Sequence, residues 1–218
     1  MATTAHPVLE PVSIDSLRPT QITVGMREVK EKRLRWREYP KDKKAEFLGR
    51  HIIPVIFGPK ERSYVVDHHH LARALHEEGI KQVLVSMVAD LRALDLNAFW
   101  VFLDHRGWVY PYNADGVRQS FDSIPKSGED LVDDPFRSLA GELRRAGGFA
   151  KDTTVFSEFL WADTLRKRGD LGQLLGECLP LESFGATLPA LHTKLHSHAC
   201  ALRRQVLQIA LMPAMPVR

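Results

Sequence analysis

Apolar and polar residues follow two different periods along the first half of the chain. Residues 12–17 alternate apolar and polar side chains, which predicts a short strand. The stretch 24–49 has helical spacing, and Pro40 divides it into two helices. Two apolar, β-branched runs within 51–67 flank a Gly-Pro-Lys-Glu turn at 58–61 and predict a β-hairpin. The elements expected next are a helix over 68–80, a strand over 81–90, a helix over 91–103 and a short strand or turn over 108–116.

The second half of the chain is helical in pattern. Residues 133–170 are spaced as a helix, a break at Gly147-Gly148 and a second helix, and the tail over 171–211 adds one or two more. We therefore expect an α+β protein with three parts. These are a flexible arm over 1–12, a core of mixed sheet and helices over 13–125, and a helical extension packed on the core over 126–218.

Composition narrows the functional classes. The 218 residues are 44% hydrophobic and 26% charged, which excludes a disordered or fibrous chain. The net charge of +3 is too balanced to indicate nucleic acid on its own. Residues 1–16 lack the pattern of a secretory signal, and no apolar run reaches the roughly 18–20 residues that span a bilayer. Cys178 and Cys200 form neither a disulfide framework nor a zinc motif. We expect a cytoplasmic protein without membrane association.

The stretch 27–50 is the most basic part of the chain, with ten basic against five acidic residues. One interpretation is a solvated helix face. The other is a rim of positive charge around an anion site, or a contact surface for DNA.

The junction at Asp67-His68-His69-His70 is the best candidate for chemistry. A carboxylate ends a buried strand, and three histidines occupy the first turn of the next helix. Backbone N–H groups without partners and the helix dipole favour an anion at that position. Asp67 could hold a metal or orient a nucleophile, and the histidines could donate to phosphate oxygens or transfer protons.

Simpler interpretations stay open at this junction. In one of them, Asp67 serves simply as the cap of the helix, and the histidines are ordinary surface residues. Zinc is disfavoured because adjacent helical residues point about 100° apart. A second candidate cluster, His196, His198 and Cys200, also has diverging spacing. Glu28 lies at the start of the basic helix, where an acid commonly offsets the helix dipole.

Several ordered motifs resemble the ParB-like nuclease family of the ParB/sulfiredoxin superfamily. The resemblance covers residues 14–168. The motifs that carry it are Leu17-Arg18-Pro19-Thr20-Gln21, Val24-Gly25 with Arg27-Glu28-Val29, the hairpin, Val66-Asp67-His68-His69-His70-Leu71-Ala72-Arg73, Phe99-Trp100, Tyr110-Pro111-Tyr112, Asp134 to Leu139, Gly147 to Lys151 and Glu158 to Ala162. The resemblance implies a ParB/sulfiredoxin-like small mixed sheet with helices, whose strand–helix box binds nucleotide phosphates. Known members include CTP-hydrolysing partition proteins, sulfiredoxins, free serine kinases and proteins with nuclease activity, so the fold alone does not select a reaction.

The resemblance also assigns roles. Residues 67–70 match the Asp-Gly-His-His box of kinase-like members, with His68 in place of glycine and Leu71 in place of the following arginine. Glu28 corresponds to the glutamate that acts as catalytic base. Sulfiredoxin chemistry is disfavoured because the box lacks cysteine, and partition is disfavoured because no helix-turn-helix with a dimerisation segment is evident. The predicted phosphate-binding residues are Arg18, Gln21, Gly25, Lys30, His68, His69, His70 and Arg73.

The resulting hypothesis is phosphoryl transfer or phosphate-ester hydrolysis. It requires Mg²⁺ on Asp67, a nucleotide such as ATP, ADP or CTP, and a small hydroxyl substrate, with Glu28 as base and His69 and His70 stabilising the transferred charge. The alternatives are a nuclease or DNA-binding protein that uses the same site, and a non-catalytic regulatory module that binds a nucleotide.

Overall fold

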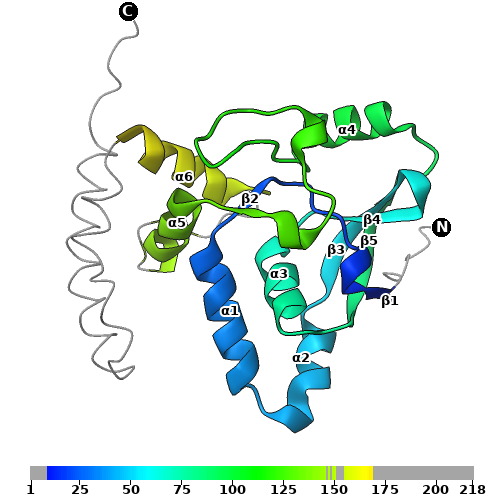
Figure 1. The fold of residues 1–218 in the computed structure, drawn as a ribbon, viewed down its shortest axis with the longest axis vertical. Coiled ribbons are helices and arrows are strands. Elements are labelled where there is room, and N and C mark those ends of the chain that lie inside the picture. The colour runs from blue at the N-terminus through cyan, green and yellow to red at the C-terminus, as the bar shows by residue number, and fades with distance from the viewer. Residues whose placement is uncertain (1–8, 146, 148, 151–154, 169–218) are drawn as a thin grey trace, which may run out of the picture. The chain divides into compact units, whose positions relative to one another are not determined.

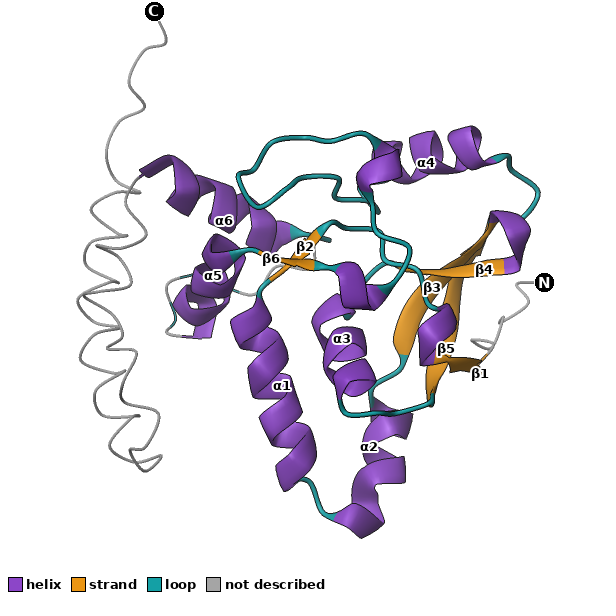
Figure 2. Cartoon of the chain, viewed as in Figure 1, coloured by secondary structure: helices purple, strands orange, loops and turns teal. Residues whose placement is uncertain are grey.

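The computed structural model describes residues 9–145, 147, 149–150 and 155–168 (Figure 1). The chain divides into two compact units, residues 1–138 and 139–218. The described helices are α1 (Met26–Glu38), α2 (Lys44–Arg50), α3 (His69–Glu77), α4 (Leu96–His105), α5 (Pro135–Arg145) and α6 (Ser157–Arg168). The described strands are β1 (Leu9–Ser13), β2 (Thr23–Val24), β3 (Ile53–Gly58), β4 (Arg62–Val65), β5 (Gln82–Asp90) and β6 (Val132–Asp133). Figure 2 shows this mixture of helices and strands, which confirms the α+β prediction.

A four-stranded sheet with the order β1-β5-β3-β4 forms the centre of the first unit. The outer pairs are antiparallel, while β3 and β5 run parallel, so the sheet is mixed. Val55 lies opposite Val65 on β4 and Met87 on β5, and the register with β5 shifts between Val55 and Ile56. The parallel pair requires a crossover, which contains α3.

Alternate residues of β3 enter two different hydrophobic clusters, as expected for a strand buried on both faces. Ile53 and Val55 pack in one cluster with side chains of α1 and α3, while Ile56 packs in the other with side chains of β4 and α4. In the first cluster these partners are Trp36, Leu71 and Leu75, and in the second they are Tyr64, Phe99 and Leu103. The start of α3 is thereby fixed against the sheet next to α1 (Figure 1).

A third cluster joins α1 to α3 through Val24, Val29, Ala74 and Leu131. It lies next to a second, two-stranded sheet, in which β2 and β6 pair in parallel. The sequence analysis missed this pair because each strand has only two residues and the partners are distant in the chain. Since β6 pairs with β2, the first unit extends to Ser138, beyond the predicted core boundary at residue 125.

Most predicted elements of the first unit are present. The helical stretch breaks near Pro40 into α1 and α2, and the predicted hairpin is the antiparallel β3–β4 pair. The strand predicted over 12–17 lies earlier, at Leu9–Ser13, and a short 3₁₀ helix follows at Ile14–Ser16. The boundary of the predicted arm differs with it. Leu9–Ser13 pairs with β5, so residues 9–12 belong to the sheet and not to the predicted arm. Pro11 fits there because β1 is an edge strand.

The second unit contains the remainder of α5 and α6. The ion pair between Arg144 Nη1 and Glu158 Oε1 joins them over 2.7 Å. The rings of Phe149 and Trp161 stack with centroids 4.4 Å apart. The helices predicted over 171–211 lie outside the described residues.

Candidate functional site

The candidate site begins at the tight reversal between β4 and α3. His68 has φ 67° and ψ 22°, in the left-handed region where glycine is favoured. His68 stands where the box that the sequence resembles carries glycine, the residue that adopts this conformation without steric cost. A non-glycine residue in this conformation costs roughly 1–2 kcal/mol.

His69 and His70 connect this turn to the segment that leads into α1. Both side chains are buried. The backbone N–H of Thr20 donates to His69 Nε2 over 3.2 Å, and the N–H of Gly25 donates to His70 Nε2 over 3.0 Å. Each imidazole therefore accepts a hydrogen bond at Nε2, and the neutral form of each carries its proton on Nδ1.

Burial keeps both imidazoles neutral. It lowers the pKa of His69 to about 3, although the nearby Asp67 carboxylate acts in the opposite direction. It also lowers the pKa of His70 well below its usual value of 6.5, and the Arg137 guanidinium lowers it further. At neutral pH the two side chains contribute hydrogen bonds but no positive charge to this site.

We call residues 67–70 the His box. Glu28, from the first turn of α1, lies against its last residue, His70. Its Oε2 is 3.8 Å from His70 Nε2 and accepts a hydrogen bond from Arg137 Nη1 over 3.2 Å. Lys32 Nζ lies 3.8 Å from the other carboxylate oxygen. The side chain of Glu28 is only 11% exposed, so it is a nearly buried carboxylate placed between two cations. We call Glu28, Lys32, His70 and Arg137 the Glu28 cluster.

The starts of α1, α3 and α5 meet at this cluster. Asp133 Oδ1 accepts from the N–H of Met26 at the start of α1 over 2.8 Å. Asp134 Oδ1 accepts from the N–H groups of Phe136 and Arg137 at the start of α5. Among the described residues, no side chain caps α3, and its first turn contains no acid. The start of α3 therefore differs from the other two in having no aspartate as its cap.

Asp67 stands beside this open helix start. Its side chain is 72% exposed, Oδ1 accepts from the backbone N–H of His68 over 2.6 Å, and Oδ2 lies 3.9 Å from His68 Nε2. A carboxylate next to a phosphate repels it unless a cation lies between them. Mg²⁺ commonly takes one protein carboxylate together with phosphate oxygens and waters, so Asp67 fits a metal that arrives with its ligand.

The predicted cationic residues Arg18 and Arg73 hold a loop at 126–130. Arg73 Nη1 donates to the carbonyl of Gly128 over 2.8 Å, and Arg18 Nη1 donates to the carbonyl of Lys126. His76 Nε2, one turn after Arg73, lies 2.9 Å from Glu129 Oε1 and 3.0 Å from Asp15 Oδ1. The cavity enclosed here has a volume of about 20 Å³, room for about one water molecule.

The remaining predicted residues are placed differently. Gln21 is buried, and its Nε2 donates to the carbonyl of Thr23 over 2.6 Å. Gly25 packs so closely on the α5 start that a Cβ there would lie 2.8 Å from Ser138 Oγ. Lys30 is exposed and follows Glu28 by two positions, about 200° around the helix, so it projects from another flank of α1.

Two important residues had no role in the sequence analysis. Asp133 caps α1 from β6, and Arg137 pairs with Glu28. Asp133 is the first residue of the predicted helical stretch 133–170, and Arg137 lies within a motif of the family resemblance. Their link to α1 depends on the β2–β6 pair, which the local pattern did not indicate.

Other predicted sites gain no support from the described part of the chain. It contains no group of three or more histidine, cysteine or acidic side chains able to hold a metal ion. The candidate cluster His196, His198 and Cys200 lies outside that part. Nor do the described helices include one long and apolar enough to cross a bilayer.

Comparison with known proteins identifies the family. A family model described as "Putative ParB-like nuclease" matches residues 10–167. The crystal structure of protein Atu1540 from Agrobacterium tumefaciens is similar, with a TM-score of 0.73 and 47% sequence identity. That match covers 89% of this chain and 92% of the other. No curated protein matches. The matched residues contain the His box, Glu28 and Arg137, and the chain belongs to this ParB-like family.

Proposed function

We propose that this ParB-like protein binds the phosphate groups of a nucleotide at the β4–α3 junction and transfers or hydrolyses a phosphoryl group there. One observation carries the proposal. Where three helix starts meet, aspartates cap two, and the third has no side-chain cap and lies beside the exposed Asp67 and next to the Glu28 cluster. An anion is the ligand that such a helix start favours.

Glu28 is the proposed base. The hydroxyl oxygen of the acceptor, or of water, attacks phosphorus while the bond to the leaving oxygen breaks, and the hydroxyl proton passes to the Glu28 carboxylate. Arg137 and Lys32 hold that carboxylate in place. Because it is nearly buried, only a small hydroxyl group could reach it, which favours a small substrate.

Asp67 would hold Mg²⁺, which when bound neutralises phosphate charge. The chain itself contributes the exposed carboxylate and the backbone N–H groups of the first turn of α3.

The two buried histidines take different parts in the proposal. Nε2 of His69 accepts from the N–H of Thr20, and the ring also hydrogen-bonds to the carbonyl of Val65, which accepts. His69 therefore positions the turn. His70 uses Nε2 for Gly25, and the described residues provide no partner for its Nδ1. His70 is therefore proposed as a neutral donor to phosphate through Nδ1–H, and not as a cation.

Nuclease activity at the same site is the second candidate, because the matched family is described as a nuclease family. The basic stretch gives it only partial support. Arg33 and Arg37 are both paired with Glu78, which lowers their availability to a DNA backbone. A protein that binds DNA mainly through phosphate contacts should lose affinity steeply with salt.

A thermal-shift screen tests the proposal. The full chain is mixed with ATP, ADP, CTP, GTP, pyrophosphate or short DNA, with and without Mg²⁺. We expect a magnesium-dependent rise in melting temperature with at least one nucleotide, since a ligand of the folded state must stabilise it. Turnover with that nucleotide should then depend on Glu28, so Glu28→Gln should abolish turnover while binding persists.

Three outcomes would change this conclusion. A flat nucleotide panel with a salt-sensitive response to DNA would favour the nuclease. Binding without turnover in the wild-type chain would indicate a regulatory module. No response to any ligand would contradict a phosphate site at this junction.

A further inference from the structure

The segment of residues 18–20 runs beside β4 and begins a parallel ladder with it. The N–H of Arg18 donates to the carbonyl of Ser63 over 2.9 Å, and the N–H of Val65 donates to the carbonyl of Arg18 over 2.8 Å. The bonds of a parallel ladder are evenly spaced, so the next bond expected joins the N–H of Thr20 to the carbonyl of Val65. That bond would carry the ladder to the last residue of β4.

Thr20 replaces this expected bond with two others. Its side-chain hydroxyl donates to the carbonyl of Val65 over 2.7 Å, in place of the backbone N–H. The N–H of Thr20 is thereby left for His69 and donates to Nε2 over 3.2 Å. The hydroxyl oxygen itself lies 3.4 Å from the same nitrogen. The ladder therefore turns from β4 to α3 at the residue where the strand ends.

The surroundings of Thr20 hold it in this arrangement. Thr20 and Val65 are both buried, and the carbonyl of Thr20 accepts from the N–H of Tyr110 over 2.8 Å. A buried carbonyl that loses its donor is costly, so the carbonyl of Val65 needs a donor from residue 20. Whether the hydroxyl or the N–H supplies it decides whether His69 receives the N–H.

We infer that Thr20 is a positioning residue for the His box, because its hydroxyl satisfies the carbonyl of Val65 and leaves the backbone N–H to hold His69. Without the hydroxyl, the N–H of residue 20 returns to the carbonyl of Val65, as in an ordinary ladder. Nε2 of His69 then loses its donor, and the first turn of α3 moves. The consequence for phosphate binding rests on the proposed function, whereas the effect on His69 does not.

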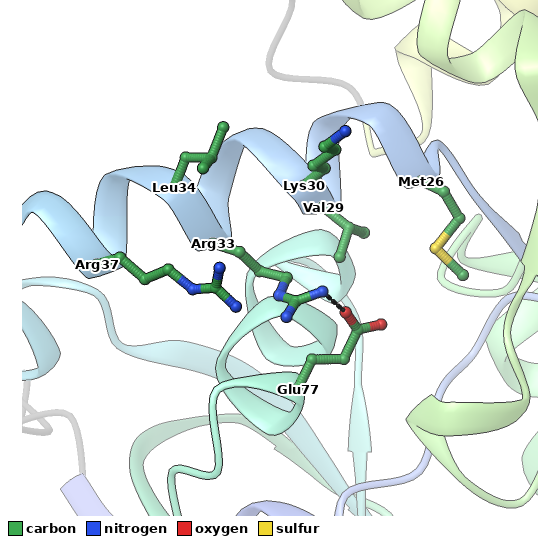
Figure 3. A pocket seen from close by; sticks show the side chains of 7 residues that line it. All are labelled: Met26, Val29, Lys30, Arg33, Leu34, Arg37 and Glu77. Carbon is green, nitrogen blue, oxygen red and sulfur yellow. Dashed lines mark hydrogen bonds and ion pairs between the residues drawn. The ribbon is translucent and has the colours of Figure 1, made fainter. Parts of the chain in front are cut away.

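The other end of α3 is held independently of Thr20. Arg33 Nη1, on α1, lies 2.5 Å from Glu77 Oε2, in the last turn of α3. Figure 3 shows this ion pair in the lining of a cavity of about 300 Å³ formed by side chains of α1 and α3. Loss of the Thr20 hydroxyl should therefore displace the start of α3 and leave its end on α1.

Thr20→Val tests this inference, because valine has nearly the shape of threonine but no hydroxyl. Proton–nitrogen NMR spectra of the full chain at neutral pH report the state of each imidazole nitrogen, and the His69 signals are those absent from His69→Gln. We expect the Nε2 resonance of His69 to change in Thr20→Val and to stay at its wild-type position in Thr20→Ser. Thr20→Ala should give the same change as Thr20→Val, and it serves if the valine variant does not fold.

Thr23→Val is the matched control. Thr23 is buried on the same segment, but its hydroxyl has no hydrogen-bond partner among the described residues. The substitution therefore removes a hydroxyl at equal burial without removing a hydrogen bond to β4. The His69 signals and the affinity for nucleotide should both remain those of the wild type.

Affinity for the nucleotide that stabilises the wild type, measured with Mg²⁺, connects Thr20 to the phosphate site. Thr20→Val should lose affinity about tenfold, and Thr20→Ser less than about twofold. Unchanged affinity in Thr20→Val would overturn this connection.

The NMR comparison decides the role of Thr20 by itself. Unchanged His69 signals in Thr20→Val, or an equal change in Thr23→Val, would overturn the inference. A wild-type chain that binds no nucleotide would contradict the proposed function, and the His69 signals would still support or overturn the positioning role of Thr20.

Discussion

The histidines at the start of α3 and the arginines along α1 are both runs of basic residues, but they act in opposite ways. His69 and His70 are buried and neutral, and they accept backbone hydrogen bonds that fix the turn. Arg33 and Arg37 remain charged and partly exposed, and they pair with carboxylates on α3 and at its C-terminal end. Both runs join the same two parts of the chain, α3 and the segment of residues 20–38, through different chemistry.

The difference lies in burial. An imidazole loses its charge at modest cost when it is transferred from water, because its ordinary pKa lies close to neutral pH. A guanidinium cannot do so, and it either stays near water or finds a carboxylate. A count of basic residues therefore overstates the positive charge at the His box. Along α1 the same count is a better guide, because the arginines there stay charged.

The largest expected effect comes from pH. The unfolded chain binds protons at histidine below about pH 6.5, whereas folded His69 does so only near pH 3 and His70 well below 6.5. Stability is then complete above pH 6.5 and falls with pH by about 1.4 kcal/mol per unit for each histidine. For His69 alone, the free energy of unfolding should drop by about 2 kcal/mol between pH 6.5 and 5, and His70 adds a loss in the same direction. Urea unfolding at several pH values measures this loss.

Two variants show which histidines cause the pH dependence of the free energy of unfolding. His70→Gln keeps an oxygen to accept from the N–H of Gly25 but does not titrate, so it should lose the part of the pH dependence that comes from His70. His105→Gln, at an exposed position of α4, should keep all of it. A free energy of unfolding that stays flat between pH 6.5 and 5 would show that the imidazoles are not buried as neutral groups.

The next effect concerns the Glu28 cluster. Glu28→Ala leaves the buried Arg137 guanidinium without this carboxylate, and removing one partner of a buried ion pair costs about 3–5 kcal/mol. Glu38→Ala, at an exposed site on the same helix, should change stability by less than about 0.5 kcal/mol. Chemical denaturation compares the two, and equal small losses would mean that Glu28 is not buried against Arg137.

A pair of glycines gives an intermediate effect with opposite signs. Gly25→Ala places a Cβ 2.8 Å from Ser138 Oγ and 3.0 Å from its backbone nitrogen, so stability should fall by about 1–3 kcal/mol. A Cβ at Gly49, in α2, would meet no atom within 4 Å, so Gly49→Ala should stabilise the helix by about 0.5–1 kcal/mol. Melting temperatures that shift with the same sign for both variants would contradict the close packing of Gly25 on the α5 start.

The smallest effect is a gain at His68. His68→Gly relieves the left-handed conformation at φ 67° and restores the glycine of the kinase-like box, so stability should rise by about 1 kcal/mol. His68→Ala, which keeps the steric penalty, should bring no comparable gain. If thermal unfolding shows equal changes in both variants, the histidine side chain matters more than the backbone.

Local pattern was sufficient for most helices of the first unit and for the β3–β4 hairpin. Pro40 predicted the break between α1 and α2, and the Gly-Pro turn predicted the β3–β4 hairpin. Both signals depend only on neighbouring residues in the chain. The acceptor role of His69 and His70 was not predictable in this way, since burial and partners arise only when residues 20–25 pack on α3. The same holds for Arg137 and the β2–β6 pair, which depend on contacts between distant parts of the chain.

The most direct test of the central claim is the affinity for the nucleotide that stabilises the chain most, measured with Mg²⁺ in the wild type, in Asp67→Asn and in the matched surface variant Asp122→Asn. If the phosphates bind at the open start of α3 beside Asp67, Asp67→Asn should lose affinity about tenfold or more, and Asp122→Asn should not. Equal affinity in all three proteins would contradict a phosphate site at this junction.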